Sequence, residues 1–470
     1  MARSLETNLA EGNVFKKLVN FAIPILLANI LQMFYSLVDT LVVGRIVGSV
    51  GISAVTIGSQ VAQIFICVGM GFANGAQVLI SQLMGANDRD GLKSAIGSLL
   101  SISALIGIAA GVIGIAAANP LLKLMNTPAE AWDQAVDYMV ISSAGLIFVF
   151  MYNAISCIMR GLGDSTRPLI FVAIASVINI ILDIVFVGPL GMGAGGAALA
   201  TILAQGLSAA FGFVYLYRRR AEFVFDFRLK SFAIRSKWVK ELSRMGVPQI
   251  LQMAAISISM LYVLAMVNVY GVVATSTVGV SNKIMNIFTM PFHATSTSAC
   301  SMAGQNAGAG KYDRVKKVVH ITLLINIVLL GISTFFTFVF GSQMVSVFDT
   351  DPEVIEYGVK YLKIQFFCMV GHTMFCTFNA TCLGVGNALL STIAFMMDGV
   401  VTRLVLCILS VYVFDWGLIG IFWANSIPAC VCGVILLTYY LSGKWMTYKS
   451  AVVRGADAEY LAALELEQNS

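Results

Sequence analysis

The feature that most constrains this chain is a run of about 20 mostly apolar residues that recurs along nearly its whole length. A helix of about 20 such residues crosses a hydrocarbon core of about 30 Å. The runs are continuous, whereas the strands of a membrane barrel would be about ten residues long and would alternate apolar with polar positions. With 58% apolar and 11% charged residues, the chain is predicted to be an all-α integral membrane protein.

The runs predict twelve transmembrane helices, six in each half of the chain. A stretch this regular leaves little length for a separate soluble domain. The predicted spans are 18–43, 52–79, 92–118, 132–159, 168–188, 195–217, 241–270, 275–300, 316–341, 357–383, 388–413 and 418–441.

Basic residues gather in alternate loops of this topology, and acidic residues gather in two of the loops between them. Short loops rich in Lys and Arg stay on the cytoplasmic side of a membrane. All the basic segments fall on one side, so both termini are expected to be cytoplasmic. This topology explains the net charge of +5, and no nucleic-acid partner is predicted. The basic residues include Lys16, Lys17, Arg89, Lys93, Arg160, Arg167, Arg218, Arg219, Arg220, Lys311, Arg314, Lys316 and Lys444.

The two halves are predicted to be copies of one unit. Matching residues recur 223 positions apart, and the register holds over a long stretch. Because each copy has an even number of spans, the copies enter the membrane from the same side and form parallel repeats. The matched pairs are Gln82 with Gln305, Gly85 with Gly308, Asp90 with Asp313, Glu130 with Glu353, Gly163 with Gly386 and, after a one-residue gap, Pro24 with Pro248.

The duplication defines the expected domains. We predict an N-terminal lobe at 1–220, a cytoplasmic linker at 221–240, a C-terminal lobe at 241–445 and a cytoplasmic tail at 446–470. The polar linker would let one lobe rock against the other.

A small group of polar residues lies inside the predicted spans of the N-terminal lobe. Asp39 and Asp183 are its acids, and an acid at the centre of a membrane helix costs about 2.5–3.5 kcal/mol on insertion scales. Asn179, Thr201 and Asn153 add amide and hydroxyl oxygens. Such oxygens suit a hard monovalent cation, and the acids could instead carry protons. The alternative is structural, with Asp39 capping a kink and Asp183 bonding a backbone group.

The acids have no counterparts in the second half, where Asp39 corresponds to Val263 or its neighbour and Asp183 to Leu406. The repeat itself therefore does not require them for packing. The C-terminal lobe has Asp398, Arg403 and Lys283 within its spans instead. We interpret these three as a polar network, either structural and gating or directly involved in binding.

Histidines and cysteines predict no metal centre. His293 and His372 have no carboxylate at ligand spacing, and we interpret them as ordinary interior histidines. None of the nine cysteines shows a metal-ligand spacing to a histidine. A bound Na⁺ is thus the one metal ion that the sequence suggests.

Flexible apolar side chains accompany the helices expected to line a cleft between the lobes. Surfaces of this kind suit promiscuous apolar ligands. The candidate cleft residues are Met33, Tyr35, Met70, Met285 and Phe288.

The whole chain resembles the multidrug and toxic compound extrusion (MATE) family, one family of a wider superfamily of multidrug exporters and lipid flippases. The resemblance rests on Pro24 with Val38-Asp39-Thr40, on Gln82-Leu-Met-Gly85-Ala86 and on Arg160-Gly-Leu-Gly163-Asp164-Ser-Thr166-Arg-Pro168. Asn179 with Asp183, the small residues from Gly193 to Ala198, and Thr201 look like the DinF-like branch.

The resemblance implies a bacterial inner-membrane antiporter that exports cationic, amphipathic drugs in exchange for Na⁺ or H⁺. It implies alternating access between two lobes, a monomer surrounded by lipid bilayer, and no cofactor. Its cation site would fall on Asp39, Asn179, Asp183 and Thr201, with Asn153 nearby. The chain departs from branches with an acid in the second lobe, because the span after Pro248 holds glutamines but no acid.

Four other interpretations remain open. A major-facilitator transporter is disfavoured because the loop from Gly85 to Gly91 has the wrong spacing. A lipid-linked oligosaccharide flippase resembles this chain, but such proteins commonly have about fourteen spans by family resemblance. A membrane enzyme would need a catalytic set that the sequence lacks. A channel is the fourth possibility, although two similar lobes joined by a linker favour a carrier.

Overall fold

The computed structural model describes residues 8–220 and 225–448, and nearly all of these residues are helical. They divide into two compact units. One unit contains Ile23–Ile250, and the other contains Leu9–Ala22 together with the chain from Leu251 onward. Helices α1 and α8 therefore each begin in one unit and end in the other. The change of unit comes beside Pro24 in α1 and beside Pro248 in α8.

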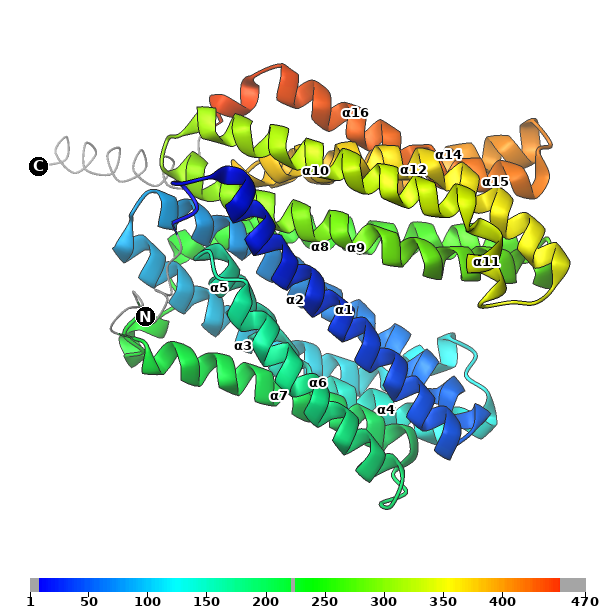
Figure 1. Cartoon of the computed structure of the whole chain (residues 1–470). Helices are drawn as coiled ribbons and strands as arrows, with labels where there is room; N and C mark the ends of the chain where they lie inside the picture. The colour runs from blue at the N-terminus through cyan, green and yellow to red at the C-terminus, as the bar shows by residue number, and fades with distance from the viewer. Residues whose placement is uncertain (1–7, 221–224, 449–470) are drawn as a thin grey trace, which may run out of the picture. The chain divides into compact units, whose positions relative to one another are not determined.

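The N-terminal unit is a helix bundle in which α6 packs on α7 and α2 packs on α3, α4 and α5 (Figure 1). The chain then passes through a short turn, η2 (Leu229–Phe232), before α8. The elements are α1 (Val14–Ile46), α2 (Ser49–Gly85), α3 (Arg89–Leu124), η1 (Ala129–Ala131), α4 (Trp132–Ala144), α5 (Leu146–Gly161), α6 (Thr166–Val187) and α7 (Gly193–Arg218).

The C-terminal unit is organised around α12, which packs against α9, α10 and α16. Its eleventh predicted span is irregular, because two π-helical segments, η3 and η4, interrupt it. The elements are α8 (Ser236–Asn268), α9 (Val272–Gly308), α10 (Tyr312–Val339), α11 (Gly341–Ser346), α12 (Pro352–Gly384), α13 (Ala388–Met396), η3 (Met397–Thr402), α14 (Arg403–Ile408), η4 (Leu409–Val413), α15 (Gly417–Ser426), α16 (Pro428–Leu441) and η5 (Lys444–Met446).

The helices confirm the predicted all-α membrane fold. Ten described helical segments are long and apolar enough to cross a membrane, and the bent pair formed by η1–α4 and α5 raises the number to 11. The remaining predicted span, 275–300, lies in α9, which is as long as α2 at 37 residues. Helix α9 is less apolar because it carries many Ser, Thr and Asn residues, and about half of its residues are buried within the unit.

The duplication is visible in the element boundaries. Helix α2 starts at Ser49 and ends at Gly85, and α9 starts and ends 223 positions later, at Val272 and Gly308. The turns repeat as well. Gly163 and Gly386 follow equivalent helices and have φ angles of 90° and 96°. Glycine adopts this left-handed conformation without the steric cost that other residues pay, so the same turn needs glycine in both copies.

One difference between the copies is a break in the N-terminal unit. The predicted span 132–159 is two helices that meet at Gly145 with a bend of 45°. A Cβ atom at Gly145 would lie only 2.2 Å from the Ile202 side chain, so this crossing requires glycine. The corresponding α12 runs unbroken from Pro352 to Gly384.

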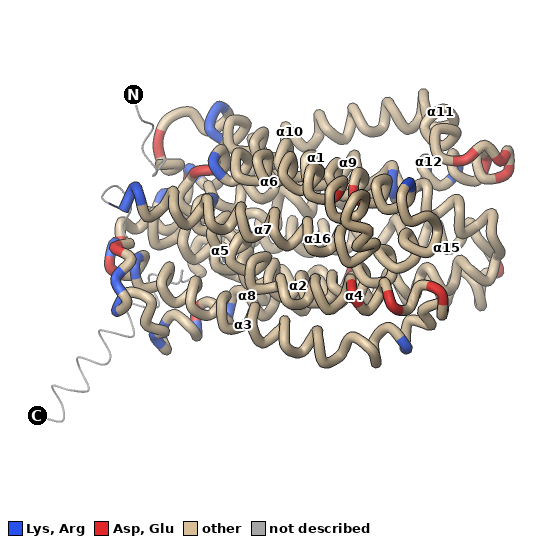
Figure 2. Tube along the Cα trace, turned by 90° about the horizontal axis from the view of Figure 1, so that it is seen from below, with Lys and Arg blue, Asp and Glu red and all other residues tan. Residues whose placement is uncertain are grey.

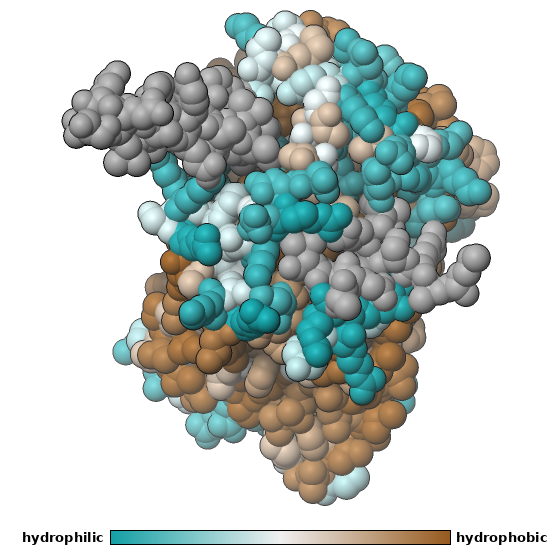
Figure 3. Space-filling view, turned by 90° about the vertical axis from the view of Figure 1, so that its left-hand side faces the viewer, coloured by the Kyte–Doolittle hydropathy of each residue, from teal (hydrophilic) through white to brown (hydrophobic). Residues whose placement is uncertain are grey.

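Charge is sorted along the helices of each unit, as the topology predicts. In the N-terminal unit most basic residues gather at the α2–α3 turn and at the end of α7, and acids gather around η1 and α4 (Figure 2). Arg45 and Lys123, at the ends of α1 and α3, are basic exceptions at the opposite helix ends. In the C-terminal unit the basic residues lie at the α9–α10 turn, and the acids lie at the start of α12. Figure 3 shows hydrophilic residues gathered beside hydrophobic ones on the face that it presents.

The described part of the linker is fastened to α3 of its own unit. Lys93 of α3 forms an ion pair with Asp226 at 2.6 Å, and Ser101 donates to the carbonyl of Phe232 at 2.7 Å. The carbonyl of Ser231 lies so close to Gly97 that a Cβ atom there would clash with it. The Lys93 ammonium, with hydrogen bonds from the Ser231 hydroxyl and the Arg228 N–H, holds the pKa of Asp226 well below its usual range.

The Asp226 contact predicts a pH-dependent linker. Because the folded pKa is lowered, the ionised carboxylate stabilises the folded linker above the unfolded pKa of about 3.9 and loses this effect as the pH falls below it. Asp226→Asn should therefore lower the melting temperature at neutral pH, and its difference from wild type should shrink toward zero in acid. Thermal melts of both proteins across pH measure this. A Lys93→Met/Asp226→Asn double variant should lose little more than either single variant. A difference that stays constant at all pH values would contradict the assignment.

Candidate polar site in the N-terminal unit

The two predicted acids of the N-terminal unit meet inside its helix bundle. Asp183 on α6 is fully buried, and Asn179, one turn earlier on the same helix, is 1% exposed. Asp39 comes from α1, and its carboxyl group neighbours that of Asp183. The Thr201 hydroxyl of α7 donates to Asp39 Oδ2 at 3.4 Å. Three helices thus bring four of the five predicted residues together.

The sequence of α6 explains why Asn179 and Asp183 point inward. Apolar residues with helical spacing, including Ile174, Val177 and Ile181, cover the exposed face of α6. Ser176, Asn179 and Asp183 follow one another at intervals of three and four residues on the opposite, buried face. The apolar stripe suits lipid, so the polar stripe is left to face the other helices of the unit.

The polar group is short of hydrogen bonds and of positive charge. In the described residues, neither Asp183 oxygen has a donor, and Asp39 Oδ1 and both amide atoms of Asn179 also lack partners. No ion pair found in the same residues involves Asp39 or Asp183. Two buried carboxylates without a counter-charge are costly, because burial and mutual repulsion both oppose ionisation. The arrangement therefore favours the uptake of a proton or a small cation.

The donor set suits either of these occupants. Carboxylate, amide and hydroxyl oxygens are ligands for hard cations. Two neighbouring carboxyls can alternatively share one proton, as like charges in close contact do.

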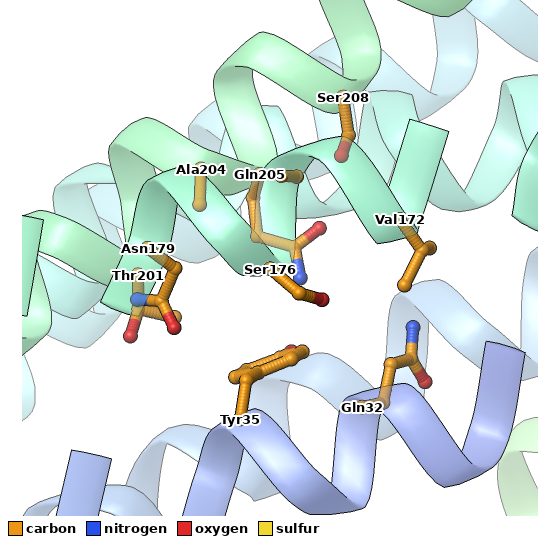
Figure 4. A pocket seen from close by; sticks show the side chains of 10 residues that line it. Gln32, Tyr35, Val172, Ser176, Asn179, Thr201, Ala204, Gln205 and Ser208 are labelled. Atoms are coloured by element: carbon orange, nitrogen blue, oxygen red, sulfur yellow. The ribbon is translucent and has the colours of Figure 1, made fainter. Parts of the chain in front are cut away.

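A small cavity adjoins this group and is lined by residues of α1, α6 and α7 (Figure 4). Its free volume is about 10 Å³, which is the space of one water-sized sphere. Asn179 and Thr201 belong both to the cavity wall and to the acid group. In Figure 4 the ring of Tyr35 lies across the cavity from Ser176. The lining residues are Gln32, Tyr35, Val172, Ala175, Ser176, Asn179, Thr201, Ala204, Gln205 and Ser208.

Gln32, Ser176, Gln205 and Ser208 were not identified from the sequence, although a signal for them exists. The polar residues form three stripes with helical spacing, which place the members of each stripe on one helix face. Such a stripe in an otherwise apolar span marks a face turned away from lipid. The stripes are Gln32, Tyr35 and Asp39 on α1, Ser176, Asn179 and Asp183 on α6, and Thr201, Gln205 and Ser208 on α7.

The fifth predicted residue, Asn153, has a local role. Its side-chain amide donates to the carbonyl of Val149, one turn earlier on α5, at 2.9 Å. In the described residues no hydrogen bond found joins Asn153 to Asp39 or Asp183.

The candidate cleft residues have different surroundings. Tyr35 lines the polar cavity, and Met33 and Met70 are half-buried. Met285 is 6% exposed and belongs to the hydrophobic core of the C-terminal unit, with Phe288 packed against that core. Met285 therefore contributes to packing within its own unit.

The position equivalent to the acid pair is apolar in the C-terminal unit. Val263 and Cys407 belong to one buried cluster, and Leu406 packs against it. The same scaffold thus carries an unneutralised acid pair in one copy and a hydrophobic cluster in the other.

The polar network predicted in the C-terminal unit joins two of its three residues. Arg403 and Asp398 form a buried ion pair at 3.0 Å. They are five residues apart across η3, and a π-helical turn, with its i to i+5 bonding, brings residues at this spacing closer than an α-helix does. Lys283 on α9 is exposed and forms no ion pair among the described contacts.

One sequence interpretation is wrong. We concluded from the sequence that no cysteine has a metal-ligand spacing to a histidine. Cys376, however, follows His372 by four residues and so lies on the same face of α12. His293 of α9 lies beside them, and one ligand atom from each of the three residues lies within 4.8 Å of the other two.

Comparison with known families identifies the chain. The family model described as MatE matches twice, over residues 24–185 and 248–409, which together cover more than half of the chain. The chain belongs to the MATE family. The two matches are offset in the same way as Pro24 and Pro248, which confirms the duplication.

MATE relatives match over most of their length. The probable multidrug resistance protein YpnP of Bacillus subtilis is 32% identical over 77% of this chain and 80% of the relative. NorM of Thermotoga maritima, also named a probable multidrug resistance protein, is 27% identical over 92% of this chain and 93% of its own. The multidrug export protein MepA of Staphylococcus aureus is 24% identical over 94% and 97%.

Solved structures share the fold. A transporter of the MOP superfamily from Pyrococcus furiosus has a TM-score of 0.88 at 22% identity and covers 95% of this chain and 99% of that one. An outward-facing multidrug resistance MATE transporter has a TM-score of 0.86 at 22% identity, over 93% and 98%. This protein is accordingly a multi-pass membrane transporter of a multidrug efflux family, not an enzyme. MATE transporters need no cofactor and use ion gradients.

The acid pair predicts a measurable cost to stability. Replacing both acids by the residues of the other copy, Asp39→Val with Asp183→Leu, should raise the stability of the ion-free protein by about 1–4 kcal/mol, as apolar replacements of buried charges often do. Melting of the purified protein without Na⁺ at neutral pH measures this.

The matched control is Asp398→Leu. This variant leaves Arg403 buried without its partner and should lower stability by about 3–5 kcal/mol. Destabilisation of similar size in both variants would show that the acids of the N-terminal unit are structural.

Proposed function

We propose that this MATE transporter exports cationic, amphipathic organic compounds from the bacterial cytoplasm in exchange for inward-moving Na⁺ or H⁺. The observation that supports this proposal is the pair of neighbouring carboxyl groups of Asp39, which is half-buried, and Asp183, which is fully buried, without a counter-ion in the described residues. The coupling site comprises Asp39, Asn179, Asp183 and Thr201.

Competition for the acid pair is the proposed basis of exchange. An entering ion removes one negative charge from the carboxyl pair, and the attraction of the pair for a cationic substrate is then weaker. When the ion leaves, the pair regains its negative charge and the affinity for the cation returns. Each ligand therefore weakens the other by the same factor, as linkage requires.

The small cavity in the unit fits an ion better than a drug, because its free volume is about 10 Å³. The substrate must therefore bind in another conformation of the transporter, or beside the site. Alternating access of an N-terminal lobe (1–220) and a C-terminal lobe (241–445), joined by the 221–240 linker, would supply the second conformation. The tail, 446–470, lies mostly outside the described residues.

The proposed setting is the inner membrane of a bacterium, with both termini cytoplasmic and the protein acting as a monomer. The basic residues at one end of the helices of each unit support this orientation. In this orientation the transporter would bind cationic substrates from the cytoplasmic side and export them.

Transport in liposomes tests the proposal. Purified protein should drive efflux of a fluorescent cationic dye under an imposed Na⁺ gradient or proton gradient, and Asp39→Asn and Asp183→Asn should each abolish gradient-driven efflux because they remove a charge and keep the shape. Asn153→Ala is the matched control on α5 and should retain most activity, since its amide bonds its own helix.

The two gradients separate the possible coupling ions. Efflux driven by one gradient alone names the ion. Full activity of both acid variants would contradict the proposed site. The absence of dye movement driven by either gradient would favour a lipid-linked oligosaccharide flippase.

A further inference from the structure

The interior of the C-terminal unit holds a group of metal-binding side chains that ion-driven drug export does not use. His372 and Cys376 lie one turn apart on α12, and His293 comes from α9. Helices α9 and α12 pack along each other, and the two histidine rings meet edge to face with centroids 5.1 Å apart. We propose that His293, His372 and Cys376 form a binding site for a soft monovalent cation, Cu(I), that joins α9 to α12.

The spacing of the donor atoms suits one metal ion. All three lie within 4.8 Å of one another. A metal at their centre would therefore be at most about 2.8 Å from each, and side-chain shifts of less than about 1 Å would give bonds of about 2.0–2.3 Å, as in zinc–imidazole and zinc–thiolate sites. Small rotations of three side chains achieve this without moving the helices.

An unsatisfied polar atom points to a missing ligand. The Nε2 atom of His372 is inaccessible to solvent and has no hydrogen-bond partner in the described residues. A buried imidazole nitrogen without a partner is uncommon and costs free energy. In the proposed site this nitrogen is the ligand atom of His372, and the metal bond satisfies it. The neighbouring Phe292 and Phe375 rings contact His372 and offer it no hydrogen bond of ordinary strength.

The charge balance favours a monovalent ion. The site contains no carboxylate, and Cys376 is fully buried in an apolar cluster with residues such as Met369 and Phe375. When the metal binds, the Cys376 thiol releases its proton and the thiolate cancels the charge of Cu(I). A divalent ion would leave one net positive charge in this apolar region, which is costly. The nearby Arg403 is already paired with Asp398 and does not alter this balance.

Donor softness gives the same answer. Thiolate is a soft ligand that prefers Cu(I), and imidazole binds copper well. Three donors provide the low coordination number that Cu(I) accepts. His293 lies on the exposed edge of the group, so it provides a route of entry and a ligand that exchanges readily.

Anaerobic titration of the purified full-length protein with Cu(I), against a chromophoric Cu(I) chelator, tests the site. Wild type should bind one tight equivalent that Cys376→Ser and His372→Gln lose. His293→Gln should weaken binding at least about tenfold, since even the loss of a supporting residue around a metal ligand commonly costs that much. His293 is exposed, so this variant removes a ligand without disturbing the core.

A control variant and a spectroscopic measurement test whether the bound Cu(I) occupies the proposed site. Cys300→Ala removes another buried cysteine of α9 and should leave the tight equivalent unchanged. X-ray absorption at the copper edge should show one sulfur and two nitrogen neighbours. Binding that is equal in all variants, or lost to the same extent in Cys300→Ala, would overturn the site. Displacement of Cu(I) by equimolar Zn(II) would overturn the proposed class of metal.

Discussion

Two carboxyl groups held against each other inside a bundle of membrane helices are the constraint on which the proposed ion exchange of this protein depends. Asp183 is fully buried and Asp39 is half-buried. Three of their four oxygens have no donor in the described residues, and no cationic side chain neutralises them there. In a medium of low dielectric constant this state is stable only with a proton or a small cation added. The requirement for an exchangeable positive charge follows from burial and repulsion alone.

The second copy of the duplicated scaffold is built without this constraint. Element boundaries, glycine turns and prolines repeat between the two units, yet the place of the acid pair is filled by an apolar cluster around Val263 in the second. The same fold fills the position of the acid pair with hydrophobic side chains in the second copy and with polar side chains in the first. This difference between the copies separates the repeated helix scaffold, which holds each bundle together, from the acid pair, which we propose couples ions to export.

The sequence predicted the helices, the duplication and the meeting of Asp39, Asn179, Asp183 and Thr201. Apolar runs, a constant offset between the copies and polar residues inside apolar spans each lead to these predictions, because the geometry of a helix is known in advance. It did not predict the bend at Gly145, which depends on the approach of Ile202, or the π-helical turn that pairs Asp398 with Arg403. Asn153 was assigned by depth alone, and depth does not give direction. Cys376 was missed although it follows His372 by four residues, and only the third member of the group, His293, comes from another helix.

Equilibrium binding of a cationic fluorescent substrate to the purified transporter, at a series of Na⁺ concentrations and pH values, tests the central claim most directly. If the acid pair holds one exchangeable positive charge, the apparent affinity for the substrate should fall in proportion to added Na⁺ or H⁺, and Asp183→Asn should remove that dependence. Substrate affinity in wild type that does not change with either ion would contradict the account.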